Sequence, residues 1–142
     1  MIVKNHMTSN PATITPKEDA KVAFHLLKKY GFRQFPVVKD GALIGMVTDR
    51  DLRPALTELD PRVDDVMTPN PVTILEDATV EEASRIISDR KFNALPVVSS
   101  TGELVGIITV TDILRSFLDP FRSGIEVNTF EGGDAYEDDF QR

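Results

Sequence analysis

The sequence predicts a mixed α/β (α+β) fold made of two pseudo-symmetric repeats, each ordered βαββα, packed sheet to sheet and followed by an acidic tail. Three observations lead to this prediction. The chain repeats itself after about sixty residues, each copy alternates strand-like and helix-like segments, and each copy ends its last strand in a Gly-x-x-Thr-x-x-Asp motif. A copy of about 55 residues is too small for a comfortable core of its own, so we expect the copies to pack together.

The repeat is strong enough to define the organisation of the chain. Residues 7–38 align with residues 67–98 with 11 identities in 32 positions, and residues 43–52 align with residues 104–113 with 4 in 10. Chance would give about three identities in all. We therefore place the first repeat at 1–58, a short linker at 59–62, the second repeat at 63–119 and the tail at 120–142.

The first copy opens with a short predicted strand at residues 12–14, which a Thr-Pro pair closes. Pro16 and the acids that follow it predict the start of a helix, and Gly31 predicts its end. The apolar residues in between recur at helical spacing, so one face of this helix should be buried. They are Ala20, Ala23, Phe24, Leu27 and Tyr30.

A predicted hairpin follows the helix. Residues 35–38 and 43–47 are extended apolar runs, and Lys39-Asp40-Gly41-Ala42 is typical of the turn between two antiparallel strands. The second run leads to Thr48, where a short helix should begin. Pro54 should end or kink that helix because proline removes a backbone donor.

The second copy repeats this plan, and the tail then changes composition. Val80, Ala83, Ile86 and Ile87 should form the buried face of its first helix. Pro120 should end its second helix, and residues 120–142 are expected to be disordered or to form an arm that docks on a partner. The apolar residues of that second helix are Ile113, Leu114, Phe117 and Leu118.

Composition excludes several classes of protein. The chain has 142 residues, of which 41% are hydrophobic and 27% charged, which is typical of a soluble globular domain. No run approaches the roughly 18 apolar residues of a membrane span, and the N-terminus lacks a signal-peptide pattern. There is no cysteine, hence no disulfide and no thiolate zinc site. We expect a cytoplasmic protein with no membrane association.

The charge is concentrated near the C-terminus. The net charge is −7, and residues 119–142 carry seven acids against two bases, which is −5. The remaining 118 residues carry 16 acids and 14 bases, which is −2. Because neither part has the basic stripe that nucleic-acid binding usually requires, a nucleic-acid partner is not expected.

The residue content also argues against an enzyme. The chain has no cysteine nucleophile, no candidate Ser–His–acid set and no Gly-x-x-x-x-Gly-Lys phosphate loop. Its two histidines, His6 and His25, stand apart from one another and from any cluster of acids. We therefore predict neither catalytic residues nor a metal site.

The duplicated Thr-x-x-Asp corners are the candidate functional residues. Thr48 with Asp51, and Thr109 with Asp112, have the spacing of a capping box, in which each side chain accepts a hydrogen bond from the other residue's backbone N–H. The same groups at a strand-to-helix junction could instead hold a ribose and its phosphate. Duplication of both residues favours a ligand role for at least one corner.

Taken together, the repeat, the Pro-Val-Val runs at 36–38 and 96–98 and the paired corners resemble a tandem CBS-domain pair, or Bateman module, over residues 1 to about 119. The opening residues 1–8 are also similar to stand-alone small CBS proteins of the acetoin-utilisation accessory type. The resemblance implies a non-enzymatic regulatory or energy-sensing module. Its ligands would be adenosine-containing: AMP, ADP, ATP, S-adenosylmethionine or NAD.

The resemblance also implies composite pockets, in which the corner of one copy faces the helix and strand wall of the other. The aspartates would accept hydrogen bonds from ribose hydroxyls, the threonines would bind ribose or phosphate, and apolar wall residues would enclose the adenine. One pocket would combine Thr48, Arg50, Asp51 and Met46 with Thr79, Ala83, Phe92, Asn93 and Ala94. The other would combine Thr109, Thr111, Asp112 and Ile107 with Ala23, Phe32, Arg33 and Gln34.

The two implied pockets are not equivalent. Arg50 could supply the cation for a phosphate in one pocket and Arg33 in the other, although both could be ordinary surface cations. The second copy has Thr111 and Asn93 at these positions, so the pockets should differ in affinity or in phosphate number. Phe24, Phe32 and Phe92 could equally be core residues rather than base-stacking platforms.

Partners follow from the same resemblance. An adenosine-containing small molecule would be a regulatory ligand rather than a required cofactor, and a homodimer formed through the helices is expected. A regulated enzyme or transporter could be a further partner. The alternative is a structural or interaction protein of the same fold, which dimerises or docks on an enzyme while its pockets stay unoccupied.

Overall fold

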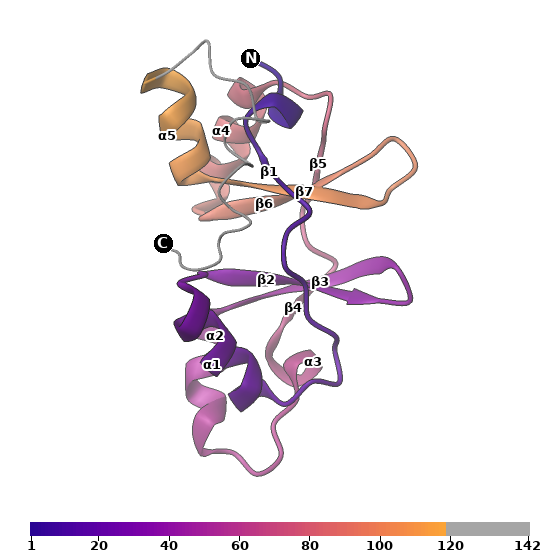
Figure 1. Ribbon diagram of the computed structural model, residues 1–142, viewed down its shortest axis with the longest axis vertical. Coiled ribbons are helices and arrows are strands. Elements are labelled where there is room, and N and C mark those ends of the chain that lie inside the picture. Colours follow the sequence, from indigo (N-terminus) through magenta and orange to yellow (C-terminus); the bar gives the residue numbers. More distant parts are fainter. Residues whose placement is uncertain (119–142) are drawn as a thin grey trace. The chain divides into compact units, whose positions relative to one another are not determined.

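The computed structural model describes residues 1–118, which divide into two compact units (Figure 1). Unit 1 combines Met1–Pro11 with residues 72–118, and unit 2 is Ala12–Pro71. The units therefore do not coincide with the sequence repeats, because each opening segment joins the unit formed by the other copy. The predicted tail at 120–142 lies outside the described residues.

Unit 1 contains a four-stranded sheet covered by two helices. The sheet has the order β1-β7-β6-β5, with β5 parallel to β6 and the other pairs antiparallel. Helices α4 and α5 lie side by side on one face of it (Figure 1). The elements are the 3₁₀ helix η1 (Val3–Asn5), β1 (Thr8–Ser9), β5 (Ile74–Leu75), α4 (Val80–Arg90), β6 (Ala94–Val98), β7 (Leu104–Thr109) and α5 (Val110–Leu118).

Unit 2 is built on the same plan with a three-stranded sheet. Its order is β2-β3-β4, and both pairs are antiparallel. The elements are α1 (Ala20–Tyr30), β2 (Gln34–Lys39), β3 (Ala42–Thr48), α2 (Asp49–Leu52), η2 (Arg53–Thr57), α3 (Val63–Val66) and β4 (Thr68–Pro69). Pro54 lies where α2 gives way to the 3₁₀ helix η2, as its sequence position predicts.

Helix α1 ends where the sequence predicts, at Gly31, but it begins at Ala20 and not at Pro16, where the start was expected. Asp19 caps α1 by accepting the backbone N–H of Lys21 at 2.7 Å, and Gly31 ends this helix with a left-handed backbone (φ 72°). Thr79 begins α4 through a capping box with Glu82. Both helices therefore have their orphan N-terminal donors partly satisfied by local side chains.

The two hairpins are also as predicted. Asp40 and Gly41 both have positive φ, 51° and 82°, which is the conformation a two-residue hairpin turn requires. In both hairpins the strand register shifts at the Val-Val pair, between Val37 and Val38 and between Val97 and Val98. The internal symmetry thus extends to an irregularity of the sheets.

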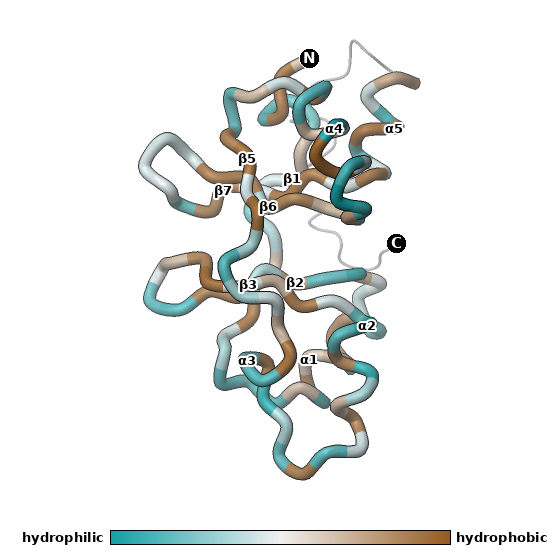
Figure 2. The backbone as a smooth tube through the Cα atoms, turned by 180° about the vertical axis from the view of Figure 1, so that it is seen from behind, coloured by the Kyte–Doolittle hydropathy of each residue, from teal (hydrophilic) through white to brown (hydrophobic). Residues whose placement is uncertain are grey.

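Each unit has its own hydrophobic core between its helices and its sheet. Figure 2 shows the strands mostly in brown and the outer turns of the hairpins in teal or white. In unit 2 the predicted face of α1 is buried through Ala20, Ala23 and Leu27, and in unit 1 the face of α4 is buried through Val80, Ala83 and Ile87. Periodicity therefore identified the core-facing sides of both helices, except that Tyr30, which was predicted on the buried face of α1, is 40% exposed at the end of that helix.

The opening segments of the copies pack on two glycines. Met7 covers Gly106 in unit 1 and Met67 covers Gly45 in unit 2; a Cβ on either glycine would stand 2.5 Å from the methionine sulfur. The segments end at Asn10-Pro11 and Asn70-Pro71, whose asparagines have left-handed backbones (φ 49° and 47°). These Asn-Pro pairs are the points at which the chain passes from one unit to the other.

Two features differ from the prediction. At residues 12–14 only Ile14 pairs, through a single parallel bridge to Val37, whereas the short strands β1 and β4 were not predicted. In the segment predicted as a linker, 59–62, the Pro61 carbonyl accepts the Ala20 backbone N–H at 2.8 Å. The first strand of each copy is thus weaker than expected, and an edge strand comes from the opposite copy.

Helix α5 buries less apolar surface than its sequence suggests. Ile113 and the small polar Ser116 are buried, whereas Leu114, Phe117 and Leu118 are 57%, 60% and 84% exposed. Leu114 and its neighbours therefore form an apolar face directed away from the core of unit 1. Across residues 1–118, none of the helices has the length and apolar character needed to cross a membrane.

Candidate functional site

The two Thr-x-x-Asp corners form matching capping boxes. In unit 2 the Thr48 backbone N–H donates to Asp51 Oδ2 at 2.9 Å, and the Asp51 N–H donates to the Thr48 hydroxyl at 3.2 Å. In unit 1 the corresponding distances between Thr109 and Asp112 are both 3.0 Å. The local prediction is confirmed, and in each corner one carboxylate oxygen is occupied by the cap.

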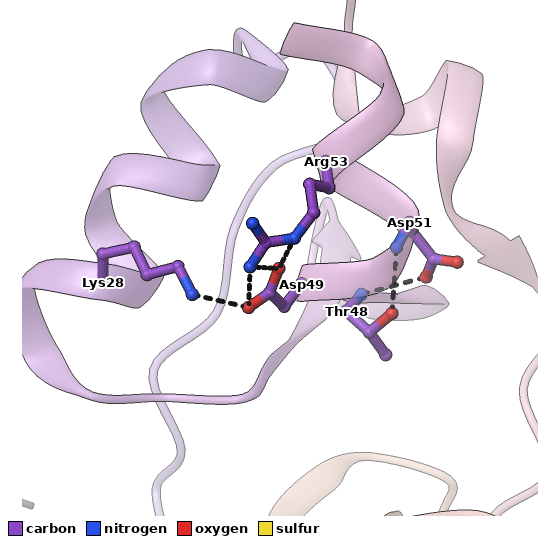
Figure 3. A network of polar contacts seen from close by, with 5 residues as sticks. All are labelled: Lys28, Thr48, Asp49, Asp51 and Arg53. Atoms are coloured by element: carbon purple, nitrogen blue, oxygen red, sulfur yellow. Dashed lines mark hydrogen bonds and ion pairs between the residues drawn. The ribbon is translucent and has the colours of Figure 1, made fainter.

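The environments of the two carboxylates differ. Figure 3 shows the second oxygen of Asp51 directed away from Thr48, and no residue in the range 1–118 donates a hydrogen bond to it. Asp51 is half-buried. Asp112 is only 5% exposed, and the Thr8 side chain from β1 interacts with its carboxyl. The Asp51 carboxylate is therefore more accessible to solvent than the Asp112 carboxyl, although both belong to the same motif.

Burial shifts the ionisation of Asp112. Loss of solvation raises the pKa of its carboxyl to about 6, against an ordinary value of 3.8. Hydrogen bonds from Thr109 and Thr8 and the charge of Arg115 act in the opposite direction and limit the rise. The free energy of the unit 1 corner therefore depends on pH in the mildly acidic range.

Each corner is hydrogen-bonded to the strand wall of its own unit. The Arg33 carbonyl accepts the Asp49 N–H at 3.3 Å, and the Asn93 carbonyl accepts the Val110 N–H at 3.0 Å. Gln34 is paired in register with Thr48, and Ala94 with Thr109. Within a unit, the structure thus brings corner and wall residues together in equivalent positions.

The cationic residues are distributed unequally. Arg33 and Arg50 both belong to unit 2 and are exposed, and neither forms an ion pair with another of the described residues. The equivalent residues of unit 1 are Asn93 and Thr111, which carry no charge. At these two equivalent positions, unit 2 is therefore positively charged and unit 1 is neutral.

A second polar network adjoins the unit 2 corner (Figure 3). Asp49 accepts a hydrogen bond from Lys28 Nζ at 2.7 Å and from Arg53 Nε and Nη2 at 3.1 and 3.2 Å. The Lys28 hydrogen bond is the main reason that the pKa of Asp49 is lowered, with further contributions from Arg53. This network, which the sequence reasoning did not identify, links the end of α1 to the start of α2.

The remaining candidate residues occupy varied environments. Ala23 and Ala83 are fully buried in the cores of their units, whereas Phe32 and Phe92 are half-buried. Phe32 packs edge-on against Phe35 at 5.9 Å between ring centroids. Met46 is half-buried on β3, Ile107 is buried on β7, and Thr79 caps α4.

Sequence reasoning missed Thr8 as a neighbour of Asp112. Its only signal was the Met-Thr-x-Asn-Pro sequence common to both copies, which gives no indication of the unit it joins. His6 is buried, which lowers its pKa, and its backbone N–H donates to the Val3 carbonyl. Residues 1–118 contain no cluster of His, Cys, Asp or Glu suited to a metal ion.

Comparison with known families gives one clear match. The family model described as "CBS domain" matches residues 3–58 and again residues 63–119. Among curated proteins, an inosine-5'-monophosphate dehydrogenase of Korarchaeum cryptofilum is 33% identical over 123 residues, which are 87% of this chain and 26% of that enzyme. The chain thus spans only about a quarter of the length of this relative.

Several solved structures share the fold. The CBSX2 protein, solved in complex with AMP, is 30% identical with a TM-score of 0.77, covering 85% of this chain and 98% of its own; CBSX2 comes from Arabidopsis thaliana. The CBS domain pair of MJ0100, solved with 5'-methylthioadenosine and S-adenosyl-L-methionine, is 30% identical with a TM-score of 0.75, covering 82% and 99%. An acetoin utilization protein (AcuB) of Vibrio cholerae is 27% identical with a TM-score of 0.76, covering 84% and 92%.

Proposed function

We propose a function for this chain from its family, because it belongs to the CBS domain family. It is a non-enzymatic regulatory module that binds an adenosine-containing ligand in clefts between its two repeats. The proposal is supported by the structural relatives solved with AMP and with S-adenosyl-L-methionine. The single observation that carries it is the corner of unit 2. Its capping box leaves one carboxylate oxygen of Asp51 without a partner among residues 1–118. A carboxylate with one free oxygen can accept hydrogen bonds from ribose hydroxyls.

In the proposed pockets each corner faces the wall of the other repeat. Asp51 and Asp112 accept hydrogen bonds from the ribose, and the adenine lies among apolar residues, including Met46 in one pocket and Ile107 in the other. The wall residues are Thr79, Ala83, Phe92, Asn93 and Ala94 for the first pocket and Ala23, Phe32, Arg33 and Gln34 for the second. Thr48, Thr109 and Thr111 complete the corners.

The two pockets should prefer different ligands. Asp51 is half-buried and has Arg50 beside it, so this corner suits a ligand that carries phosphate. Asp112 is buried with a raised pKa, and Thr111 stands where the first corner has Arg50, so the cation of the second pocket would be Arg33 on its wall rather than a residue of its corner. We propose that AMP or ATP is the ligand of the Asp51 pocket.

Binding would act by shifting an equilibrium between two arrangements of the molecule. A ligand held by both repeats is bound more tightly in the arrangement that brings corner and wall together, and this difference in affinity drives the shift. A homodimer and a regulated enzyme or transporter are the partners that such a shift could control. The dehydrogenase activity of the longer relatives is not proposed for this chain.

Titration calorimetry with AMP, ADP, ATP, S-adenosylmethionine and NAD tests the proposal. The informative variant is Asp51→Asn, because the asparagine oxygen can still cap α2 while its NH₂ group cannot accept the ribose hydroxyls. We expect Asp51→Asn to weaken AMP binding about tenfold, the effect of losing a charge-assisted hydrogen bond. The matched control is Asp40→Asn in the hairpin turn of the same unit, which should leave binding unchanged.

One observation favours the alternative of a structural or interaction protein. Both aspartates are engaged in capping boxes, and Asp112 is only 5% exposed, so at least the second corner is accounted for by helix stability. A thermal-shift screen separates the two functions, because a ligand at 100 times its dissociation constant stabilises the fold by about 2.7 kcal/mol. Absence of a shift with all five compounds would support the structural function.

A further inference from the structure

Unit 1 has a shallow groove between its two helices, outside the candidate site. Its volume is about 130 Å³ and its lining is mainly apolar. The lining residues are Ser84, Ile87, Ser88, Val110, Ile113 and Leu114. Because Leu114, Phe117 and Leu118 are largely exposed, the groove continues into an apolar face along α5.

The equivalent space between the helices of unit 2 is filled by a side chain. In unit 2 the position of Ser84 is occupied by Phe24, a half-buried ring packed against the core. Lys28 Nζ lies 5.2 Å and Arg53 Cζ 5.4 Å from the centre of this ring, and Asp49 binds both cations. Unit 2 therefore fills the space between its helices with an aromatic ring covered by an ion-paired network.

Unit 1 has neither the aromatic ring nor the charged residues of this network at the equivalent positions. Ser84 stands in place of Phe24, Ser88 in place of Lys28, and Leu114 in place of Arg53. Val110 replaces Asp49, so the site has become more apolar while its aromatic ring is missing. Such a site can accept an aromatic or aliphatic side chain from elsewhere, because burial of that side chain removes apolar surface from water on both sides.

We propose that the groove is the docking site of the chain's own C-terminal segment, with an apolar side chain from residues 121–130 taking the place that Phe24 fills in unit 2. The segment beyond α5 has 24 residues and starts directly at the exposed end of the apolar face. Its first part contains Phe121, Ile125, Val127 and Phe130. The occupant is therefore tethered next to its site.

The length of the segment suits this geometry. Leu114 lies one helical turn, roughly 6 Å, before the end of α5, and Val110 lies about two turns before it. An extended chain covers roughly 3.3 Å per residue, so the ten residues from 121 to 130 can return along the whole groove. Pro120 disfavours continuation of the helix and thus favours a reversal of direction at this point.

Apolar contact rather than charge should dominate the docking. The segment is acidic, and the two helices carry Arg85, Arg90 and Arg115, none of which has an ion-pair partner within residues 1–118. Glu81, Glu82 and Asp89 on α4 offset most of this attraction. Docking should therefore depend little on salt concentration, in contrast to a purely electrostatic contact.

Disulfide trapping in the full chain tests the proposal cleanly, because the sequence contains no cysteine. The variant Ser88→Cys with Val127→Cys places one thiol in the groove and one in the segment. We expect an intramolecular disulfide that forms about tenfold faster than in Glu81→Cys with Val127→Cys, since docking raises the effective concentration of the two thiols. Lys28→Cys with Val127→Cys is a second control at the equivalent position of the filled unit.

Two further variants of the trapping pair examine the groove and the segment separately. Ser84→Phe restores the ring that unit 2 possesses and should slow trapping about tenfold by filling the groove. Phe130→Ser should also slow trapping, and it leaves unit 1 untouched in case the larger side chain at position 84 impairs folding. A disulfide between two chains would instead assign the groove to the homodimer that the sequence leads us to expect through the helices, and it would overturn the proposal. Equal rates in all pairs would also overturn it.

Discussion

Asp112 accepts the Thr109 backbone N–H at 3.0 Å and is only 5% exposed. A helix cap of this kind does not itself require burial, because it can also form at the surface. The equivalent Asp51 makes that cap while half-buried, with an N–O distance of 2.9 Å. The difference between them therefore lies in what covers the carboxyl. In unit 1 the cover includes Thr8 from β1, whose side chain donates a hydrogen bond to the carboxyl.

This burial predicts a pH dependence of stability. The pKa of Asp112 in the folded chain is about 6 against an ordinary 3.8, so between these values the folded chain holds a proton that the unfolded chain releases. Stability from this group is therefore greatest below about pH 3.8, falls as pH rises, and is lost above about pH 6. The loss is about 3 kcal/mol at most, from about two pKa units.

The variant Asp112→Asn isolates this effect because asparagine keeps the capping oxygen and is neutral at every pH. We expect the free energy of unfolding of the variant, relative to that of the native chain, to be about 2 kcal/mol higher at pH 7.5 than at pH 4, as measured by urea unfolding. Asp51→Asn is the matched comparison at the more accessible corner. An equal gain in both variants would contradict the assignment of the effect to burial of Asp112.

A second prediction concerns the glycines under the two methionines. Alanine at position 106 would place its Cβ 2.5 Å from Met7 Sδ and 2.9 Å from the Thr8 carbonyl oxygen. Alanine at position 45 would meet Met67 Sδ at 2.5 Å, whereas the nearest backbone atom, the Thr68 carbonyl oxygen, is 3.1 Å away. Both variants should lower the free energy of unfolding by about 1–3 kcal/mol, and Gly106→Ala should lower it more than Gly45→Ala.

Shortening the methionines should separate side-chain from backbone crowding. Met67→Ala should restore part of the stability lost in Gly45→Ala, measured relative to Met67→Ala alone. Met7→Ala should restore less in Gly106→Ala, because the backbone oxygen of Thr8 remains in the way. Thermal unfolding of the two double-mutant cycles provides the measurement, and equal rescue at both sites would show that the β1 backbone can move.

Local sequence signals were sufficient for most of the fold. Gly31 marks the end of α1, and Asp40-Gly41 marks the first hairpin, because these residues adopt a positive φ directly. The start of α1 was expected at Pro16, whereas the helix begins at Ala20 after the Asp19 cap. The exchange of opening segments could not be predicted. Strands β1 and β4 have two residues each, too few for periodicity, and both copies contain the same Met-Thr pair. Identical residues cannot indicate which of two similar sheet edges they join.

The site was predictable in its local chemistry and not in its environment. The Thr-x-x-Asp spacing correctly gave both capping boxes, because a cap depends only on residues three apart. The burial of Asp112 depends on Thr8, about one hundred residues earlier in the chain. The exposure of Leu114 and Phe117 was likewise hidden, because helical periodicity identifies an apolar face without showing what covers it.

The last prediction concerns the unequal cations and rests on the proposed function. Arg50→Thr gives unit 2 the residue that unit 1 has as Thr111. If Arg50 binds the phosphate of a ligand in the Asp51 pocket, the variant should bind AMP about tenfold more weakly and adenosine unchanged, since only AMP carries the charge. Arg53→Thr is the matched control, because the Arg53 guanidinium is already paired with Asp49 at 3.0 Å. Calorimetry with both ligands distinguishes the outcomes: equal weakening for AMP and adenosine would mean that Arg50 shapes the pocket rather than binding phosphate.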